Sequence, residues 1–248
     1  KFITIANSFS VQSTTNCNVY LENVTDENNR YYMIFNTSNI IIDGWTNISG
    51  LYLCGASNFT LKNLIFNGNS SIKYGNPILS ASSQNISLQN ITISNYKYGI
   101  YLYTVLNSSI TNILVYNISQ NGIYLTSNSN NNILTNFNTY NNSYGVWLDT
   151  SINNILSNFS SYSNSIYGIY LVSNANNNTL SNFSSYSNSQ GGLLFNQNTN
   201  NNSIFNFNIF NNLRGIIFSS NSINNTFSNG TILNNTQYFI SNALKIPL

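Results

Sequence analysis

Gly99-Ile100-Tyr101-Leu102 is the clearest copy of a tetrapeptide that recurs through most of the chain. Each copy contains a glycine, an apolar residue, an aromatic or apolar residue, and then Leu or Phe. Further copies begin at Gly122, Gly145, Gly168, Gly192 and Gly215. The spacings between successive glycines are 23, 23, 23, 24 and 23 residues. A fixed period of this length is typical of repeat proteins, in which each repeat packs only against its neighbours.

Two further series keep step with the glycines. The first is an asparagine that stands two residues after an apolar side chain, at Asn63, Asn90, Asn112, Asn136, Asn158, Asn182, Asn206 and Asn229. The second, four residues later, is mostly aromatic and comprises Tyr116, Tyr140, Tyr162, Tyr186, Phe210 and Leu233. Stacked coils would align each series in a column, where Asn side chains can form hydrogen-bonded ladders and tolerate the left-handed backbone of sharp turns.

The composition of one repeat predicts strands. Short alternating apolar runs are separated by clusters of Asn, Ser and Gly, which are turn formers and poor helix-interior residues. We therefore predict an all-β fold, a single-stranded right-handed parallel β-helix (solenoid) of about ten coils of ~23 residues. Residues 1–45 fit the period poorly and are predicted to form an N-terminal cap and a first irregular coil. Residues 46–248 are predicted to form the regular coils, the last of them degraded.

Alternation along the tetrapeptide strands separates two faces. The pairs Ile100/Leu102, Ile123/Leu125, Val146/Leu148 and Ile169/Leu171 are predicted to face the core. The outward column is then Tyr52, Tyr101, Tyr124, Trp147 and Tyr170. This column is a candidate contact surface for proteins or sugars. Alternatively, it is a Tyr ladder that only stabilises the sheet through neighbouring aromatic pairs.

The composition excludes several classes of function. Only 7 Lys and Arg, 5 Asp and Glu and no His occur in 248 residues. A nucleic-acid binder needs a basic stripe that seven scattered cations do not form. No apolar run approaches the ~20 residues of a membrane span, and no signal peptide is visible. The chain is 42% hydrophobic and 14% aromatic, which does not fit disorder.

Gly-Ile-Tyr-Leu followed by Asn-Asn-x-Ile/Leu-x-x-Asn resembles the repeat of the NosD-like/pectate-lyase-like superfamily of parallel β-helices, over residues 32–240. The abundance of Asn also resembles archaeal secreted and surface proteins. The superfamily hosts polysaccharide enzymes that use clustered carboxylates, copper-accessory proteins and adhesins. A copper role is not expected here, because the chain has no His, one Met and two Cys.

The acidic residues are the candidates for a catalytic or metal site. Asp43 and Asp149 are 149 − 43 = 106 positions apart, or about 22 Å along the solenoid at the ~4.8 Å strand spacing. They cannot form the carboxylate pair of a glycosidase. Asp149 could be a lone acid, although a solvated turn residue is the preferred interpretation. Glu22, Asp26 and Glu27 could bind Ca²⁺ through oxygen ligands, but a solvated loop is preferred. We expect no catalytic residue, metal or cofactor.

Cysteines and glycosylation sequons point to a secreted protein. Cys17 and Cys54 could form a disulfide in an oxidising compartment, or remain buried thiols. Some Asn-x-Ser/Thr acceptors, such as Asn158 and Asn182, belong to the predicted ladder. The remaining candidates for N-linked glycans are Asn23, Asn36, Asn47, Asn58, Asn69, Asn85, Asn107, Asn117, Asn141, Asn177, Asn201, Asn224 and Asn234. Exposed acceptors in turns would favour modification.

These observations lead to a ranked set of functions. The first is a non-enzymatic, extracellular structural protein, a rigid glycosylated rod of a cell surface, filament or fibre, with other copies, surface proteins or glycans as partners. The second is a carbohydrate-binding or adhesion module that uses the Tyr/Trp column. The third is a polysaccharide lyase or hydrolase. With 5 carboxylates and no His, the fold should also tolerate acid, as expected for an acid-living archaeon.

Overall fold

The computed structural model describes the backbone of residues 3–4, 24–25, 31–35, 38–46, 48–68, 75–219 and 221–241. Side-chain environments are described for residues 38–46, 48–68, 75–219 and 221–237. Within these ranges the chain forms strands joined by turns and contains no helix. None of the described segments is therefore a helix able to cross a membrane.

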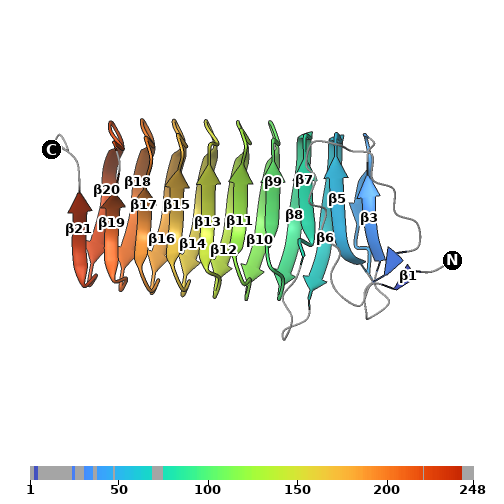
Figure 1. The fold of residues 1–248 in the computed structure, drawn as a ribbon, viewed down its shortest axis with the longest axis horizontal. Helices are drawn as coiled ribbons and strands as arrows, with labels where there is room; N and C mark the ends of the chain where they lie inside the picture. Colours follow the sequence, from blue (N-terminus) through green and yellow to red (C-terminus); the bar gives the residue numbers. More distant parts are fainter. Residues whose placement is uncertain are drawn as a thin grey trace.

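The strands alternate between two sheets that run along the molecule (Figure 1). The first sheet contains twelve strands: β1 (Ile3–Thr4), β2 (Val24–Thr25), β3 (Tyr31–Phe35), β5 (Ile48–Cys54), β7 (Ile78–Ala81), β9 (Ile100–Tyr103), β11 (Asn121–Thr126), β13 (Tyr144–Asp149), β15 (Tyr167–Val172), β17 (Gly191–Phe195), β19 (Arg214–Phe218) and β21 (Gln237–Ser241). The second contains nine: β4 (Ile41–Asp43), β6 (Ser57–Asn67), β8 (Gln84–Ser94), β10 (Ser109–Tyr116), β12 (Ile133–Tyr140), β14 (Ile155–Tyr162), β16 (Thr179–Tyr186), β18 (Ser203–Phe210) and β20 (Thr226–Leu233).

Pairing within each sheet confirms the predicted parallel β-helix. Every described pairing is parallel except that of β2 with β3, and each strand pairs with its counterpart one coil away. The nine strands of the second sheet, one per coil, enclose about eight turns, slightly fewer than the ten predicted. β3 and β4 already pair with β5 and β6, while most of residues 1–45 lie outside the described part, so the predicted domain boundary stays a prediction.

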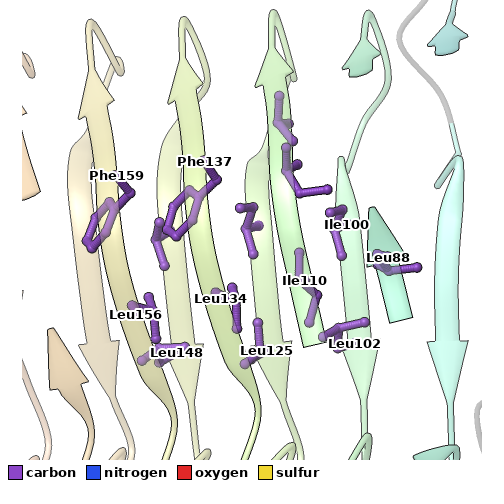
Figure 2. Packing of buried hydrophobic residues seen from close by; sticks show 14 of the residues in the cluster. Leu88, Ile100, Leu102, Ile110, Leu125, Leu134, Phe137, Leu148, Leu156 and Phe159 are labelled. Atoms are coloured by element: carbon purple, nitrogen blue, oxygen red, sulfur yellow. The ribbon is translucent and has the colours of Figure 1, made fainter. Parts of the chain in front are cut away.

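The core lies between the two sheets and follows the predicted alternation. Ile100, Leu102, Ile123, Leu125, Val146, Leu148, Ile169 and Leu171 are all at most 1% exposed. Opposite them, Phe137, Phe159 and Phe183 stack face to face, with centroids of neighbouring rings 4.5 and 4.9 Å apart. Figure 2 shows Phe137 and Phe159 on adjacent coils, with Leu134 and Leu156 beside them. Each coil thus buries several large apolar side chains, each contributing about 1.5–3 kcal/mol of transfer free energy.

Each long strand of the second sheet bends at its series asparagine. In β10, for example, the residues on both sides of Asn112 pair with β12, whereas Asn112 itself does not. Its φ is 55°, in the left-handed region that Asn tolerates better than most residues. Asn90 donates to Asn63 at 3.0 Å and Asn112 donates to Asn90 at 2.9 Å. The predicted exposed Asn ladder is therefore present at these coils.

Two buried asparagine ladders close the turns, and neither was singled out from the sequence. In the first, the side-chain oxygen of Asn154 accepts from both the backbone and side-chain nitrogens of Asn132, at 2.9 and 3.1 Å. The same arrangement links Asn164 to Asn188 in the second ladder. These residues are at most 1% exposed. The ladders satisfy backbone groups that the tight turns would otherwise leave without partners.

Candidate functional site

An aromatic surface covers the outer face of the first sheet in the middle coils. The strand register places Tyr101, Tyr124, Trp147 and Tyr170 in consecutive positions on β9, β11, β13 and β15. Centroids of successive rings lie 4.9, 5.4 and 4.9 Å apart. All four side chains are partly exposed. The predicted outward column is therefore continuous over these four coils.

Tyr52 does not belong to this exposed surface, contrary to the prediction. Its side chain is 5% exposed, and every residue of β5 is buried, so both faces of that strand are covered. Tyr52 packs in a small cluster with Cys54, Leu79 and Ala81. Leu79 also occupies the column position between Tyr52 and Tyr101, which interrupts the aromatic run. Alternation alone predicted the direction of Tyr52, but not that the outer face would be covered there.

A second row of tyrosines widens the surface. Tyr144 lies against Trp147 and Tyr170, with ring centroids 4.5 and 5.7 Å apart. Tyr98 and Tyr167 occupy similar places beside Tyr101 and Tyr170. These three residues were not predicted from the sequence. Their signal was available, because each directly precedes a repeat glycine: Gly99, Gly145 or Gly168.

Asp149 ends β13 at the edge of the aromatic surface and is hydrogen-bonded to its neighbours. Its Oδ2 accepts from the Tyr124 hydroxyl at 3.3 Å and from Thr126 Oγ1 at 3.4 Å, and its Oδ1 accepts from Thr150 at 3.0 Å. Asp149 is thus not the freely solvated turn residue that we preferred on sequence. The contact arises because Tyr124 and Asp149 are 25 residues apart, about one coil, which brings them side by side.

Tyr101 and Tyr124 remain protonated well above neutral pH. Burial raises the pKa of Tyr124, and the nearby Asp149 carboxylate adds to the effect. Burial also raises the pKa of Tyr101 to about 12. Because both phenols stay neutral at pH 7, each can donate a hydrogen bond there. The Tyr124 hydroxyl therefore stays protonated and donates a hydrogen bond to the Asp149 carboxylate.

Trp147 carries a polar group without a protein partner. Its indole Nε1 is buried and makes no hydrogen bond, although buried indole N–H groups usually find an acceptor. The indole plane is tilted by 53° from the rings of Tyr124, Tyr144 and Tyr170. Trp147 thus breaks the regular stacking at the centre of the aromatic surface, two residues before Asp149 in the chain.

Two cations flank the aromatic surface. The Lys97 ammonium lies 5.4 Å from the centroid of the Tyr98 ring, a cation–π arrangement. At the other side, Arg214 lowers the pKa of Tyr167 through a hydrogen bond and its charge, against the larger raising effect of burial. Of the three Lys and Arg with described side chains, only Lys62 lies elsewhere. The surface therefore combines two cations with one carboxylate.

The other predicted acidic sites do not form a centre. Asp43 lies on the second sheet, where it pairs with Lys62 at 3.0 Å and accepts from Asn63 at 2.7 Å. The hydrogen bond from Asn63 is the main reason that the pKa of Asp43 is lowered. Asp43 ends β4 of the second sheet and Asp149 ends β13 of the first, several coils further along, so the two carboxylates are separated as expected. The acidic residues Glu22, Asp26 and Glu27 lie outside the described residues, among which no metal-ligand cluster is found.

Some of the cysteines and glycan acceptors predicted from the sequence lie among the described residues. Cys54 is disulfide-bonded, while Cys17, the chain's other cysteine, lies outside the described residues. Among the candidate acceptors, Asn23, Asn36, Asn47 and Asn69 also lie outside. Asn117 is partly exposed, and the rest are exposed: Asn58, Asn85, Asn107, Asn141, Asn177, Asn201, Asn224 and Asn234. Asn58 and Asn85 form part of a surface ladder with Asn39. Modification of these residues stays a prediction.

Comparison with known families identifies the architecture. The family model of the right-handed beta helix region matches residues 76–232, more than half of the chain. The chain belongs to the right-handed β-helix family. This membership confirms the predicted handedness of the β-helix. No curated protein matches the β-helix in sequence.

Three solved structures illustrate what the β-helix is similar to. The mannuronan C-5 epimerase AlgE4 A-module of Azotobacter vinelandii has a TM-score of 0.53 at 13% identity, covering 87% of this chain and 80% of that chain. The periplasmic alginate epimerase AlgG has a TM-score of 0.50 at 15% identity, covering 88% and 70%. DFA-IIIase from Arthrobacter chlorophenolicus A6, as mutant C387A in complex with DFA-III, has a TM-score of 0.57 at 13% identity, covering 79% of this chain and 51% of that one.

These similarities establish the fold, and they correct one prediction. We predicted that the β-helix is not an enzyme, but the similar structures of this architecture are carbohydrate-modifying enzymes. A purely structural rod gains no support from them. The prediction rested on the ~22 Å between Asp43 and Asp149 along the solenoid, which excludes a carboxylate pair. It did not consider that stacked coils place one carboxylate beside a tyrosine from the neighbouring coil, as at Asp149 and Tyr124.

Proposed function

We propose that this β-helix is a carbohydrate-active protein that binds an acidic polysaccharide across the aromatic surface of its first sheet. The observation that carries the proposal is the continuous run of Tyr101, Tyr124, Trp147 and Tyr170 with Asp149 at its edge. Aromatic side chains supply large, rigid contact area at low entropic cost. Sugar rings present flat apolar faces that suit such a surface.

The charges favour a uronate polymer over a neutral one. Lys97 and Arg214 flank the aromatic surface, and together they can pair with the carboxylates of a uronate chain. The fold similarity to epimerases of mannuronan and alginate supports the same class of ligand. The shared axis of the strand columns also suits an extended chain, because equivalent side chains recur every ~4.8 Å.

The Asp149–Tyr124 pair supports proton transfer as the chemistry. Asp149 can accept a proton and the protonated Tyr124 hydroxyl can donate one, and general acid–base catalysis needs both roles at adjacent positions. Two-carboxylate glycoside hydrolysis is not favoured, because Asp149 is the only carboxylate on this surface among the described residues. In both epimerisation and β-elimination of a uronate residue, a base removes the proton from the carbon that bears the carboxylate. Epimerisation then returns a proton to the opposite face of that carbon, whereas β-elimination breaks the neighbouring C–O bond and protonates the departing oxygen.

The test is incubation of the purified protein with mannuronan, polyguluronate and polygalacturonate. Proton NMR would detect epimerised residues, and ultraviolet absorbance would detect the unsaturated ends of elimination. We expect activity on at least one polymer, reduced at least about 100-fold in Asp149→Asn, with Asp43→Asn, the same change at the exposed carboxylate of the second sheet, as the control. Turnover that is unchanged in Asp149→Asn would refute the assignment of the base.

A carbohydrate-binding module without catalysis is the second candidate. The single carboxylate on the surface is the observation that favours it. In that case the uronate polymers would bind, binding would weaken in Trp147→Ala, and no product would form with any of them. Absence of both binding and turnover on the whole set would contradict both candidates.

We also propose that the protein is extracellular and carries N-linked glycans. Disulfide bonding of Cys54 supports an oxidising compartment, and the exposure of Asn141, Asn177 and Asn201 leaves these acceptors accessible. Peptide mass spectrometry of native material would test this. Unmodified peptides at all three positions would contradict the glycan proposal.

A further inference from the structure

A groove runs across the outer face of the second sheet, away from the aromatic surface of the first. It has a volume of about 370 Å³ and lies over β12, β14, β16 and β18. One row of its lining comes from the bend residues Asn158, Asn182 and Asn206. The opposite row comes from Asn138, Ser160, Ser184 and Asn208, which the strand register places in one column. The volume lies within the usual range of ligand sites, ~300–1,000 Å³.

An aromatic wall runs beside the groove. Tyr140, Tyr162, Tyr186 and Phe210 stand two residues beyond the second row on the same face. Their rings are 4.8 to 4.9 Å apart at the centroids and within 12° of parallel. Because each ring covers the face of the next, the wall presents ring edges and phenol hydroxyls outward. Burial raises the pKa of Tyr162, so its hydroxyl remains a hydrogen-bond donor at neutral pH.

The exposed Asn ladder is interrupted over this groove. It links Asp43, Asn63, Asn90 and Asn112 through successive side-chain hydrogen bonds, and it resumes where Asn206 donates to Asn182 at 3.0 Å. In the described structure the side chains of Asn136 and Asn158 join no such bond. Nor do those of Asn138, Ser160 and Ser184 bond to other protein groups. Asn208 Oδ1, by contrast, accepts from Thr231 Oγ1 at 2.6 Å. The amides of Asn138 and Asn158 and the hydroxyls of Ser160 and Ser184 are thus left available to an external partner.

We propose that this groove binds a neutral polysaccharide lying along the solenoid axis. No charged side chain lines it, so an anionic polymer would find no cation and a cationic one no carboxylate. Amide and hydroxyl groups each both donate and accept, which matches sugar hydroxyls. The two rows repeat once per coil, at about 4.8 Å, so the occupant is elongated and repeating. This site is separate from the proposed uronate surface and does not depend on it.

The experiment removes the groove's polar groups without changing the backbone. The variant combines Asn158→Gly, which keeps the left-handed conformation (φ 56°), with Ser160→Ala and Ser184→Ala. The matched control is Ser157→Ala, on the same strand but across the bend. The probes are cello-, xylo-, manno- and inulo-oligosaccharides, with oligomannuronate as the charged comparison. Binding is measured by calorimetry, and melting temperature reports folding.

We expect the wild-type protein to bind at least one neutral oligosaccharide. The triple variant should weaken that binding by about tenfold or more, as expected for the loss of two or three hydrogen bonds. Ser157→Ala and Trp147→Ala should leave it unchanged. Failure of every neutral probe to bind, or neutral binding lost in Trp147→Ala but kept in the triple variant, would overturn the proposal.

A charge-introducing variant tests the groove independently. Ser184→Lys places an ammonium in the lining and should give the groove a new, salt-sensitive affinity for oligomannuronate. This measurement is made in the Trp147→Ala background, so that the first-sheet surface does not contribute. No gain of oligomannuronate binding in a folded variant would count against the groove as a polysaccharide site.

Discussion

At the scale of single residues, the repeat glycines are required by close approach between coils. A Cβ atom built on Gly145 would lie 2.6 Å from the backbone oxygen of Gly168, and it would also clash with Ser161 Oγ. Ser161 in turn donates to the oxygen of Gly168 at 2.7 Å. The glycine column therefore reflects close packing between neighbouring coils. The same contact recurs in each coil from Gly99 to Gly192, which explains why the glycines recur at a nearly constant spacing along the chain.

Gly145→Ala should therefore destabilise the fold by roughly 3 kcal/mol, as expected for overpacking against backbone that cannot yield. The control is Gly44→Asn, at a position with φ 63° and no atom within 4 Å of the added Cβ, where Asn is tolerated. Melting followed by circular dichroism compares the two. Equal melting temperatures for Gly145→Ala and the wild type would show that the coils are not packed this closely.

The buried ladders should also be sensitive to single substitutions. Asn154→Ala would leave the backbone and side-chain nitrogens of Asn132 without their shared acceptor. We expect a loss of about 2–4 kcal/mol, because buried donors are costly to leave unpaired. The control is Asn153→Gly. Asn153 is the exposed neighbour, and glycine accepts its positive φ of 58°. The free energy of unfolding is measured by denaturant titration. Equal values for Asn154→Ala and Asn153→Gly would contradict the structural role of the ladder.

At the scale of the strand, the inward aromatic column should contribute more to the free energy of unfolding than the outward one. On β14, Phe159 is 4% exposed and stacks between Phe137 and Phe183. Tyr162 stacks between Tyr140 and Tyr186 on the outer face. Phe159→Ala should cost about 3–5 kcal/mol, and Tyr162→Ala about 1 kcal/mol. Comparable losses measured by denaturant titration would show that the outer stack is as structural as the core.

Much of the strand architecture could be predicted from the sequence, for a physical reason. A period of about 23 residues and strict alternation fix which side chains stack and which face they share, as for Ile123 and Leu125. The strand pattern shows which face of a sheet points outward, but not whether other parts of the chain cover that face. The burial of Tyr52 was therefore not predicted. The Asp149–Tyr124 contact was also not predicted. It depends on how two neighbouring coils are aligned, which the order of residues within one coil does not show.

At the scale of the whole molecule, the titrating groups should make the free energy of unfolding more sensitive to alkali than to acid. Burial raises the pKa of Tyr52, Tyr98, Tyr101, Tyr124, Tyr144, Tyr162 and Tyr167 in the folded state. Their contribution is complete below the unfolded pKa of about 10 and is lost as pH rises through the folded values. The folded pKa of Tyr101, for example, is about 12. Asp43 has a lowered pKa, and its contribution is present above about pH 4 and lost as pH falls further.

We therefore expect a nearly constant melting temperature from pH 5 to 9 and a steep fall above about pH 10. In acid the fall should be slight, because Asp43 is exposed and few other groups titrate. The measurement is a series of thermal melts from pH 2 to 12. A larger loss of stability in acid than in alkali would show that the sequence-based expectation of acid tolerance is wrong.

The function depends on whether the aromatic surface of the first sheet binds polysaccharide. The most direct measurement is a titration of oligomannuronate into the wild-type protein and into Trp147→Ala, with Trp45→Phe as the control for the chain's other tryptophan. We predict saturable binding that changes the fluorescence of Trp147, survives in Trp45→Phe and weakens about tenfold or more in Trp147→Ala. Binding of equal affinity in wild type and Trp147→Ala, or no binding by either, would contradict the account.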